Sequence, residues 1–163
     1  MSATTLLKSD HATVKKLFAS FAGTSVRAAK RRQALIDKIA EELEIHSTIE
    51  EEIFYPAVKN ARGGQSLVSE AKSEHDKVDA LVAEAQGMSM DTDEVAEKVK
   101  ELRDAVVHHA TEEEREMFPL AQSQLGERLV ELGAQMAARK KELASSRVQK
   151  AKRVLKKAAR KIA

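Results

Sequence analysis

Apolar residues return every three or four positions along four segments of the chain, with polar residues between them. The segments run from about Thr4 to Ala22, up to the glycines at 63–64, from about Ser66 to Gln86, and from Asp91 to about Phe118. This period places the apolar residues of each segment on one face of an α-helix. Short connections between long helices favour antiparallel neighbours, so the pattern predicts an all-α, up-down-up-down four-helix bundle.

Local signals indicate where these helices begin and end. Glycines follow the first and third segments, as they do at many helix ends. Asp91, with a glutamate three residues later, is a variant of the capping box and predicts the start of the fourth helix. Pro119 lacks an N–H group and is expected to interrupt that helix. A further amphipathic stretch, from Gln122 to about Leu143, predicts an extra C-terminal helix.

Composition supports helices and limits the chemistry. Charged residues make up 33% of the 163-residue chain and aromatic residues only 3%, which disfavours a β protein. The absence of cysteine excludes disulfides, thiolate metal sites and cysteine catalysis. No apolar run approaches the roughly 20 residues of a membrane span. The first residues lack the apolar core of a signal peptide, so we expect a cytoplasmic protein.

Charge divides the chain into two unequal parts. Residues 139–163 carry a net charge of +10, and residues 1–138 carry −8. We therefore expect a bundle domain over residues 1–140 and a basic amphipathic tail over residues 141–163. The tail could pack on the acidic body, extend as a solvated helix, or bind nucleic acid or a membrane surface. The first two are favoured, and base stacking is disfavoured because the tail has no aromatic residue.

Each predicted bundle helix carries one histidine on its apolar face, and two helices add a glutamate one turn later. These six residues are His11, His46, Glu50, His75, His109 and Glu113. They also follow an internal repeat, since H-x-x-V recurs after 64 residues and H-x-x-x-E with its following aromatic-proline pair recurs after 63. The duplication predicts a bundle with approximate two-fold symmetry. It selects His109 rather than His108 as the core histidine of the fourth helix.

Two carboxylates among four imidazoles are costly in an apolar core unless a cation neutralises them. Imidazoles and carboxylates suit first-row metals, and carboxylates can bridge two ions. We therefore expect a dinuclear centre, with His11 and His46 nearer one ion, His75 and His109 nearer the other, and the two glutamates between them. A lone core histidine is more often only hydrogen-bonded. Four on core faces in two-fold register argue against that purely structural interpretation.

The pattern of these six residues, with E-E-x-F-Y-P at the second helix, resembles the hemerythrin family and its HHE cation-binding branch. The C-terminal stretch is similar to small actinobacterial hemerythrin-like proteins. The resemblance implies a hemerythrin-like bundle and an oxo- or hydroxo-bridged di-iron centre, with zinc or manganese less favoured. A ferritin-like protein is the nearest rival, but it would use E-x-x-H and more glutamates.

The chain lacks one imidazole ligand that the oxygen-carrying hemerythrins have on their third helix. Tyr55 is a candidate for this place, because a π-bulge next to Pro56 would bring it one turn below Glu50. The repeat partner of Tyr55 is Phe118, which cannot bind a metal. His108 and Asp79 are expected to lie around the ligands rather than among them.

The functional prediction follows from an open, asymmetric di-metal site in a chain without thiols. The first hypothesis is a di-iron, catalase-like enzyme that reacts with hydrogen peroxide. The alternative is a module that binds or senses oxygen, nitric oxide or iron without turnover. The expected partners are therefore small molecules, and the expected oligomeric state is a monomer or weak dimer.

Overall fold

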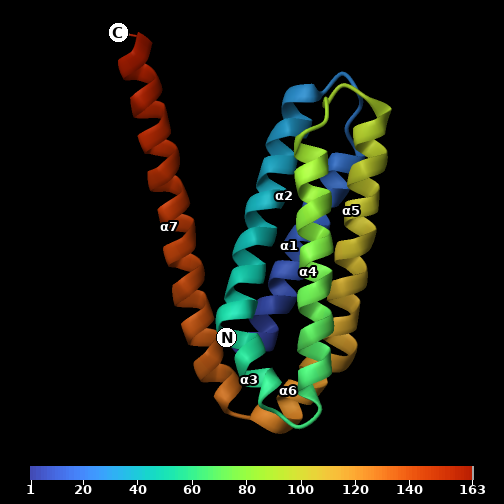
Figure 1. Ribbon diagram of the computed structural model, residues 1–163, viewed down its shortest axis with the longest axis vertical. Helices are drawn as coiled ribbons and strands as arrows, with labels where there is room; N and C mark the ends of the chain where they lie inside the picture. Colours follow the sequence, from blue (N-terminus) through green and yellow to red (C-terminus); the bar gives the residue numbers. More distant parts are fainter. Residues whose placement is uncertain (163) are drawn as a thin grey trace.

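The computed structural model describes residues 1–162, and every secondary-structure element in this range is a helix. The long helices α1 (Ala3–Ala22), α2 (Ala29–Ile49), α4 (Gly64–Gln86) and α5 (Asp93–Glu112) form an antiparallel bundle (Figure 1). Two π-helical turns, η1 (Glu50–Phe54) and η2 (Glu113–Met117), extend α2 and α5. The short helices α3 (Tyr55–Lys59) and α6 (Phe118–Leu125) follow them, and α7 (Arg128–Ile162) ends the chain. The predicted four-helix bundle with an extra C-terminal helix is confirmed.

Side-chain caps fix the starts of two bundle helices. Ser2 Oγ accepts a hydrogen bond from the Thr5 N–H at 3.3 Å and begins α1. Thr92 Oγ1 accepts from the Val95 N–H at 3.2 Å and begins α5. The prediction that Asp91 caps this helix was wrong by one residue. The Asp91 carboxylate instead accepts from Ser89 Oγ at 2.6 Å, so it is occupied within the preceding turn.

The helix that contains Pro119 does not stop there, contrary to the sequence-based prediction. In the π-helical turn η2 the Phe118 N–H reaches the Glu113 carbonyl, five residues back. The same wide turn joins the Tyr55 N–H to the Glu50 carbonyl in η1. Each proline is the second residue of the helix that follows, where its missing N–H costs little. The widened turn therefore absorbs the proline, and α6 continues to Leu125.

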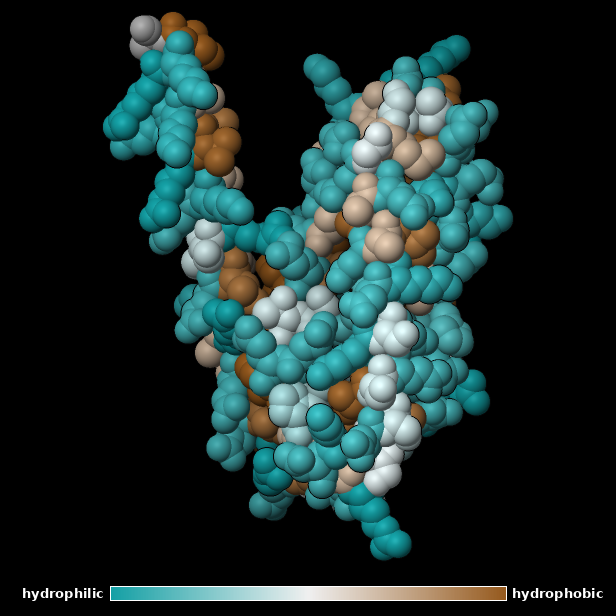
Figure 2. Space-filling model, in the orientation of Figure 1, coloured by the Kyte–Doolittle hydropathy of each residue, from teal (hydrophilic) through white to brown (hydrophobic). Residues whose placement is uncertain are grey.

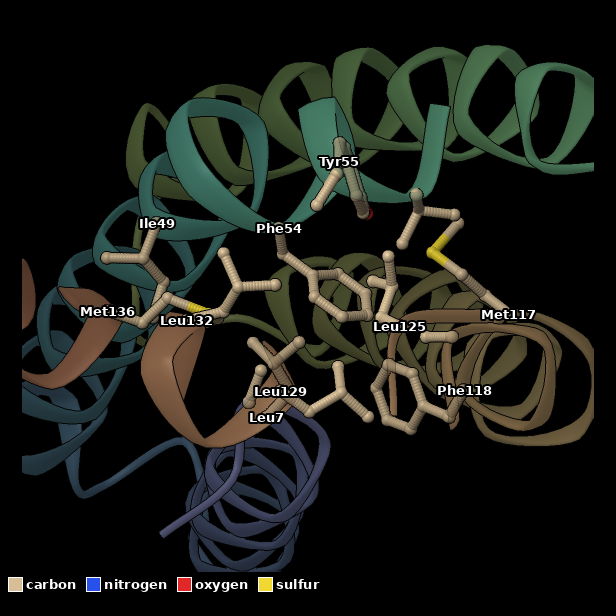
Figure 3. Close-up of a cluster of buried hydrophobic side chains, with 14 of the residues drawn as sticks. Leu7, Ile49, Phe54, Tyr55, Met117, Phe118, Leu125, Leu129, Leu132 and Met136 are labelled. Atoms are coloured by element: carbon tan, nitrogen blue, oxygen red, sulfur yellow. The ribbon is translucent and has the colours of Figure 1, made fainter. Parts of the chain in front are cut away.

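Two apolar clusters fill the bundle. One lies toward the α1–α2 and α4–α5 connections and includes Val14, Phe18, Ile39, Val78 and Leu102. The other lies toward α3 and α6 and is built around Phe54, Tyr55 and Phe118, with leucines and Met136 of α7 closing one side (Figure 3). The predicted metal-binding residues lie between the two clusters.

The first part of α7 is a true fifth element of the core. Leu129, Leu132 and Met136 are buried against α1, α2 and η1. The helix approaches the start of α1 so closely that a Cβ at Gly133 would overlap the Met1 carbonyl oxygen. A side chain at position 133 would therefore force the two helices apart.

The rest of α7 leaves the bundle. Residues 148–162, here called the C-terminal arm, are exposed along their whole length and project away from α2 (Figures 1 and 2). Arg147, just before the arm, pairs with Glu44 of α2. The arm is thus a solvated extension rather than a helix packed on the acidic body. The predicted domain boundary at residue 140 falls inside α7 and stays a prediction. Among the helices of residues 1–162, none has an apolar stretch of the length that a membrane span requires.

Leucine-to-alanine substitutions can compare the packed first part of α7 with the exposed C-terminal arm. Replacing buried Leu132 by alanine should cost about 2–5 kcal/mol in the free energy of unfolding, because it leaves a cavity beneath α7. Replacing Leu155, which is 70% exposed, should change it by less than about 0.5 kcal/mol. Chemical denaturation followed by circular dichroism measures both values. Equal losses would contradict the packing described here.

Candidate metal centre

The structure brings all six predicted residues together in the middle of the bundle. His11 comes from α1, His46 and Glu50 from α2 and η1, His75 from α4, and the last pair, His109 with Glu113, from α5 and η2. All six side chains are buried. Residues at i and i+4 share a helix face, which is why each H-x-x-x-E pair points inward from a single turn.

Their ligand atoms form two groups that share one carboxylate. One group holds His11, His46, Glu50 and Glu113, and the other holds Glu50, His75 and His109, with the atoms of each group within 4.8 Å of one another. Glu113 Oε1 also lies 3.3 Å from His11 Nε2 and 3.2 Å from His109 Nε2, so it faces both sides. The grouping of the histidines is the one that the sequence predicts.

A second layer of carboxylates surrounds the imidazoles. The Nδ1 atoms of His46, His75 and His109 lie 2.8–2.9 Å from carboxylate oxygens of Asp10, Glu51 and Glu74, respectively. His11 Nδ1 lies 3.8 Å from Glu114 Oε1, which is an ion-pair distance rather than a hydrogen bond. Carboxylates accept but do not donate when ionised, so this network assigns the imidazole protons to Nδ1. The Nε2 atoms of His46, His75 and His109 therefore present lone pairs to the centre of the site when these rings are neutral.

The second layer repeats with the same offsets as the core residues. Asp10 precedes His11 as Glu74 precedes His75, and each holds the histidine of the neighbouring helix. Glu51 and Glu114 likewise follow the two core glutamates. Of these two, Glu51 holds an imidazole, that of His75, at hydrogen-bond distance. The sequence analysis missed Asp10 and Glu74, although their position beside a core histidine in both repeats was a usable signal.

Lone pairs that face one another at the centre call for a cation. His75 Nε2 and His109 Nε2 are 3.1 Å apart, so two neutral rings with these tautomers would face one another lone pair to lone pair unless a proton or a cation lies between them. Within residues 1–162, several fully buried polar atoms make no hydrogen bond: both nitrogens of His11, His46 Nε2, both oxygens of Glu50, and Glu113 Oε1. Orphaned acceptors are costly in a dry interior. Nitrogen and carboxylate donors of this kind fit a first-row metal ion.

The electrostatics of the site show how strongly the two glutamates oppose one another. Burial, reinforced by the charge of Glu113, raises the pKa of Glu50 well above its usual range. Burial also acts to raise the pKa of Glu113, but its close contacts with the imidazoles of His109 and His11 outweigh it and hold that pKa well below its usual range. The pKa of His109 is also set by two opposing effects: burial lowers it, but the contacts with Glu113 and Glu74 outweigh burial and raise it to about 9. Without a metal, protons supply the missing positive charge.

Tyr55 enters the site from the cluster on the α3 side. The expected π-bulge is present as η1, and it turns the Tyr55 hydroxyl inward, where it donates to Glu113 Oε2 at 2.7 Å and lies 3.2 Å from His75 Nε2. Figure 3 shows this hydroxyl at the edge of the apolar cluster. The tyrosine ring stacks on His75, and Phe118 stacks on His11 in the equivalent place of the other repeat. The two halves of the site therefore differ in one phenolic oxygen.

The remaining predicted neighbours lie farther out. His108 is largely exposed, and its Nε2 lies 3.3 Å from the second oxygen of Glu74, the carboxylate that holds His109. Asp79 is exposed at the rim of the site, where burial of part of its side chain raises its pKa. Glu51, not Asp79, occupies the outer nitrogen of His75.

A small cavity lies against the imidazoles on the side opposite Tyr55. Its volume is about 30 Å³. Besides the histidines, its wall holds three polar residues (Asp10, Ser47 and Asp79) and five apolar ones: Val14, Leu43, Val78, Val106 and Ala110. A volume of this size holds about two water-sized groups. The site can thus admit a molecule of two or three heavy atoms, and little more.

The sequence profile of the hemerythrin HHE cation binding domain matches residues 2–121. The chain belongs to this hemerythrin family. Membership of a cation-binding family, together with the two buried His/Glu groups, makes this bundle a metal-binding module.

Two relatives of this hemerythrin domain illustrate its range. The crystal structure of a hemerythrin HHE cation binding domain-containing protein from Mycobacterium kansasii superposes with a TM-score of 0.82 and 28% identity, covering 92% of this chain and 91% of that one. A DNA nickase of Nostoc sp. (strain PCC 7120) is 25% identical over 120 residues, which are 74% of this chain and 33% of the nickase. The chain thus spans about a third of that relative's length.

The repulsion between the buried carboxylates of Glu50 and Glu113 predicts that removing one charge stabilises the metal-free protein. Since the folded protein raises the pKa of Glu50, that carboxyl destabilises the metal-free fold at every pH above its unfolded value. In chelator at pH 8, Glu50→Gln should therefore unfold at a higher denaturant concentration than the unsubstituted protein. The gain in the free energy of unfolding should be on the order of 1 kcal/mol.

Adding metal should reverse this order of stability, because glutamine cannot neutralise a cation. Denaturation with chelator and with excess metal gives the two comparisons. A loss of stability in chelator would contradict the electrostatic account of the pair.

Proposed function

We propose that this hemerythrin-like protein binds two iron ions and disproportionates hydrogen peroxide. The observation that carries the proposal is the cavity of about 30 Å³, which lies directly against all four imidazoles and is small enough to select a molecule of two or three heavy atoms. Hydrogen peroxide has two heavy atoms and fits such a space. Larger organic substrates do not.

The ligand assignment follows the two groups of donor atoms. His11 and His46 hold one ion, His75 and His109 hold the other, and the carboxylates of Glu50 and Glu113 lie between them. When bound, a pair of iron ions supplies the two-electron oxidation and reduction that peroxide disproportionation needs. Three of the imidazoles each have a carboxylate 2.8–2.9 Å from Nδ1. These hydrogen bonds hold the rings in place and keep their Nε2 atoms directed inward.

The protein's own contribution to the reaction is selection and positioning. The narrow cavity leaves room for only a small ligand, which it keeps next to the imidazole face of the site. Tyr55 and the aromatic cluster close the opposite face, so approach is restricted to one side. The absence of cysteine leaves no thiol that peroxide could oxidise within the chain.

The direct test is oxygen evolution by iron-loaded protein. Protein with two irons per chain should convert hydrogen peroxide to oxygen with one O₂ formed for every two peroxide molecules, measured with an oxygen electrode. His46→Ala should lower the rate at least a hundredfold, because it removes one ion's ligand. Lys72→Ala, at an exposed position of α4, is the control and should keep the rate within about twofold. Iron-replete protein that leaves peroxide untouched would exclude the proposal.

Tyr55 is proposed as an additional ligand on the side of His75 and His109, where the donor set is poorer by one residue. Iron-loaded protein should then show a phenolate-to-iron charge-transfer band in the visible range. Tyr55→Phe should remove the band without loss of folding, because Phe118 already occupies the equivalent place in the other repeat. A visible spectrum that is the same in both proteins would rule out ligation by Tyr55.

A binding or sensing role is the second candidate, and the same cavity favours it. Oxygen and nitric oxide are also two-atom molecules that fit beside the imidazoles. A reversible spectral change when either gas is added to the reduced iron protein, without consumption of peroxide, would distinguish this role from turnover. Metal analysis of protein from unsupplemented cells decides between iron and a structural zinc or manganese site.

A further inference from the structure

Helix α7 reaches the proposed metal centre through one side chain. Lys140 Nζ donates a hydrogen bond to Asp10 Oδ1, and the other oxygen of the same carboxylate lies 2.9 Å from His46 Nδ1. Asp10 is buried, while Lys140 keeps about a third of its side chain exposed. An ammonium, a carboxylate and a proposed ligand imidazole thus form a continuous chain from the molecular surface to the site.

A second contact fixes this part of α7. Arg139 donates from Nε and Nη2 to the two oxygens of Glu52 at 2.8 and 3.2 Å, a bidentate pair on the π-helical turn η1. Below it, Met136 is fully buried in the core. The backbone at residues 139–140 is therefore held from two directions, and Lys140 cannot drift far from Asp10.

The contact breaks the two-fold symmetry of the second layer. The repeat partner of Asp10 is Glu74, which holds His109 as Asp10 holds His46. The outer neighbour of Glu74 is His108, an exposed residue of α5, the same helix as His109. Within residues 1–162, α7 therefore contacts the carboxylate behind His46, which is Asp10, but not the equivalent carboxylate behind His109, which is Glu74.

We propose that Lys140 is a positioning residue that makes the His11/His46 ion position different from the His75/His109 position. By holding one oxygen of Asp10, it directs the other at His46 Nδ1 and so fixes the plane of that imidazole. Without the ammonium, a buried carboxylate oxygen would lose its partner, and Asp10 would turn toward water and release the ring. The inference rests on the proposed ligand set and adds a role for α7 in it.

Cobalt(II) titration of metal-free protein tests this inference, because the metal reports both affinity and ligand geometry through its visible absorption. The unsubstituted protein should bind two ions. Lys140→Met should weaken one of the two binding steps about tenfold and change the absorption of that step, leaving the other unchanged. Lys140→Arg, which can reach the same carboxylate, should restore most of the affinity. Lys141→Met, an exposed neighbour, is the matched control and should behave as the unsubstituted protein.

The Asp10→Asn background shows whether the lysine acts through this carboxylate. There, Lys140→Met should have no further effect on cobalt binding. Two unchanged binding steps in Lys140→Met would overturn the inference while leaving the ligand set intact. Equal weakening of both steps would also overturn it, since it would indicate general destabilisation. Failure of the unsubstituted protein to bind two ions would instead remove the proposed ligand set, and with it this role of Lys140.

Discussion

Two carboxylates and four imidazole nitrogens share a dry space in the middle of this bundle, and they cannot do so without added positive charge. His75 Nε2 and His109 Nε2 are 3.1 Å apart, and both oxygens of Glu50 have no hydrogen-bond partner within residues 1–162. Burial of such groups costs several kcal/mol each unless they are neutralised (roughly 2–7 for a polar group alone). The surrounding structure follows from this requirement: carboxylates behind the imidazoles, aromatic rings below the site, and apolar side chains above it.

The site inherits two-fold symmetry from the duplicated helix pair and then departs from it in two places. Tyr55 provides a hydroxyl where the other repeat has Phe118, and Lys140 holds Asp10 where the other repeat leaves Glu74 beside an exposed histidine. Both departures come from outside the repeated ligand pattern itself. A duplicated scaffold thus supplies two similar groups of candidate ligands, and Tyr55 together with one added helix makes the two groups inequivalent.

Wide π-helical turns are the local device that shapes the lower face of the centre. A regular α-helix would place the residue five positions after Glu50 well away from it, whereas η1 brings Tyr55 directly beneath it. The proline that follows each turn lacks an N–H and is accommodated there at little cost. In both repeats the widened turn and the proline occur together, and in both an aromatic ring is stacked on an imidazole as a result.

Periodicity and repetition along the chain were enough to predict the bundle, the six central residues and their division into two groups, since these depend on helical spacing that is local. The same reasoning placed a π-bulge before Tyr55. It did not predict that the helix continues past Pro119, although the repeat places the same aromatic-proline pair after Glu113 and the same wide turn forms there. It also could not pair Lys140 with Asp10, which are 130 residues apart. Contacts of that kind arise only when helices pack, because the angle at which α7 crosses α1 and α2 is set by the close approach at Gly133 and by buried Met136, not by any local pattern in the sequence.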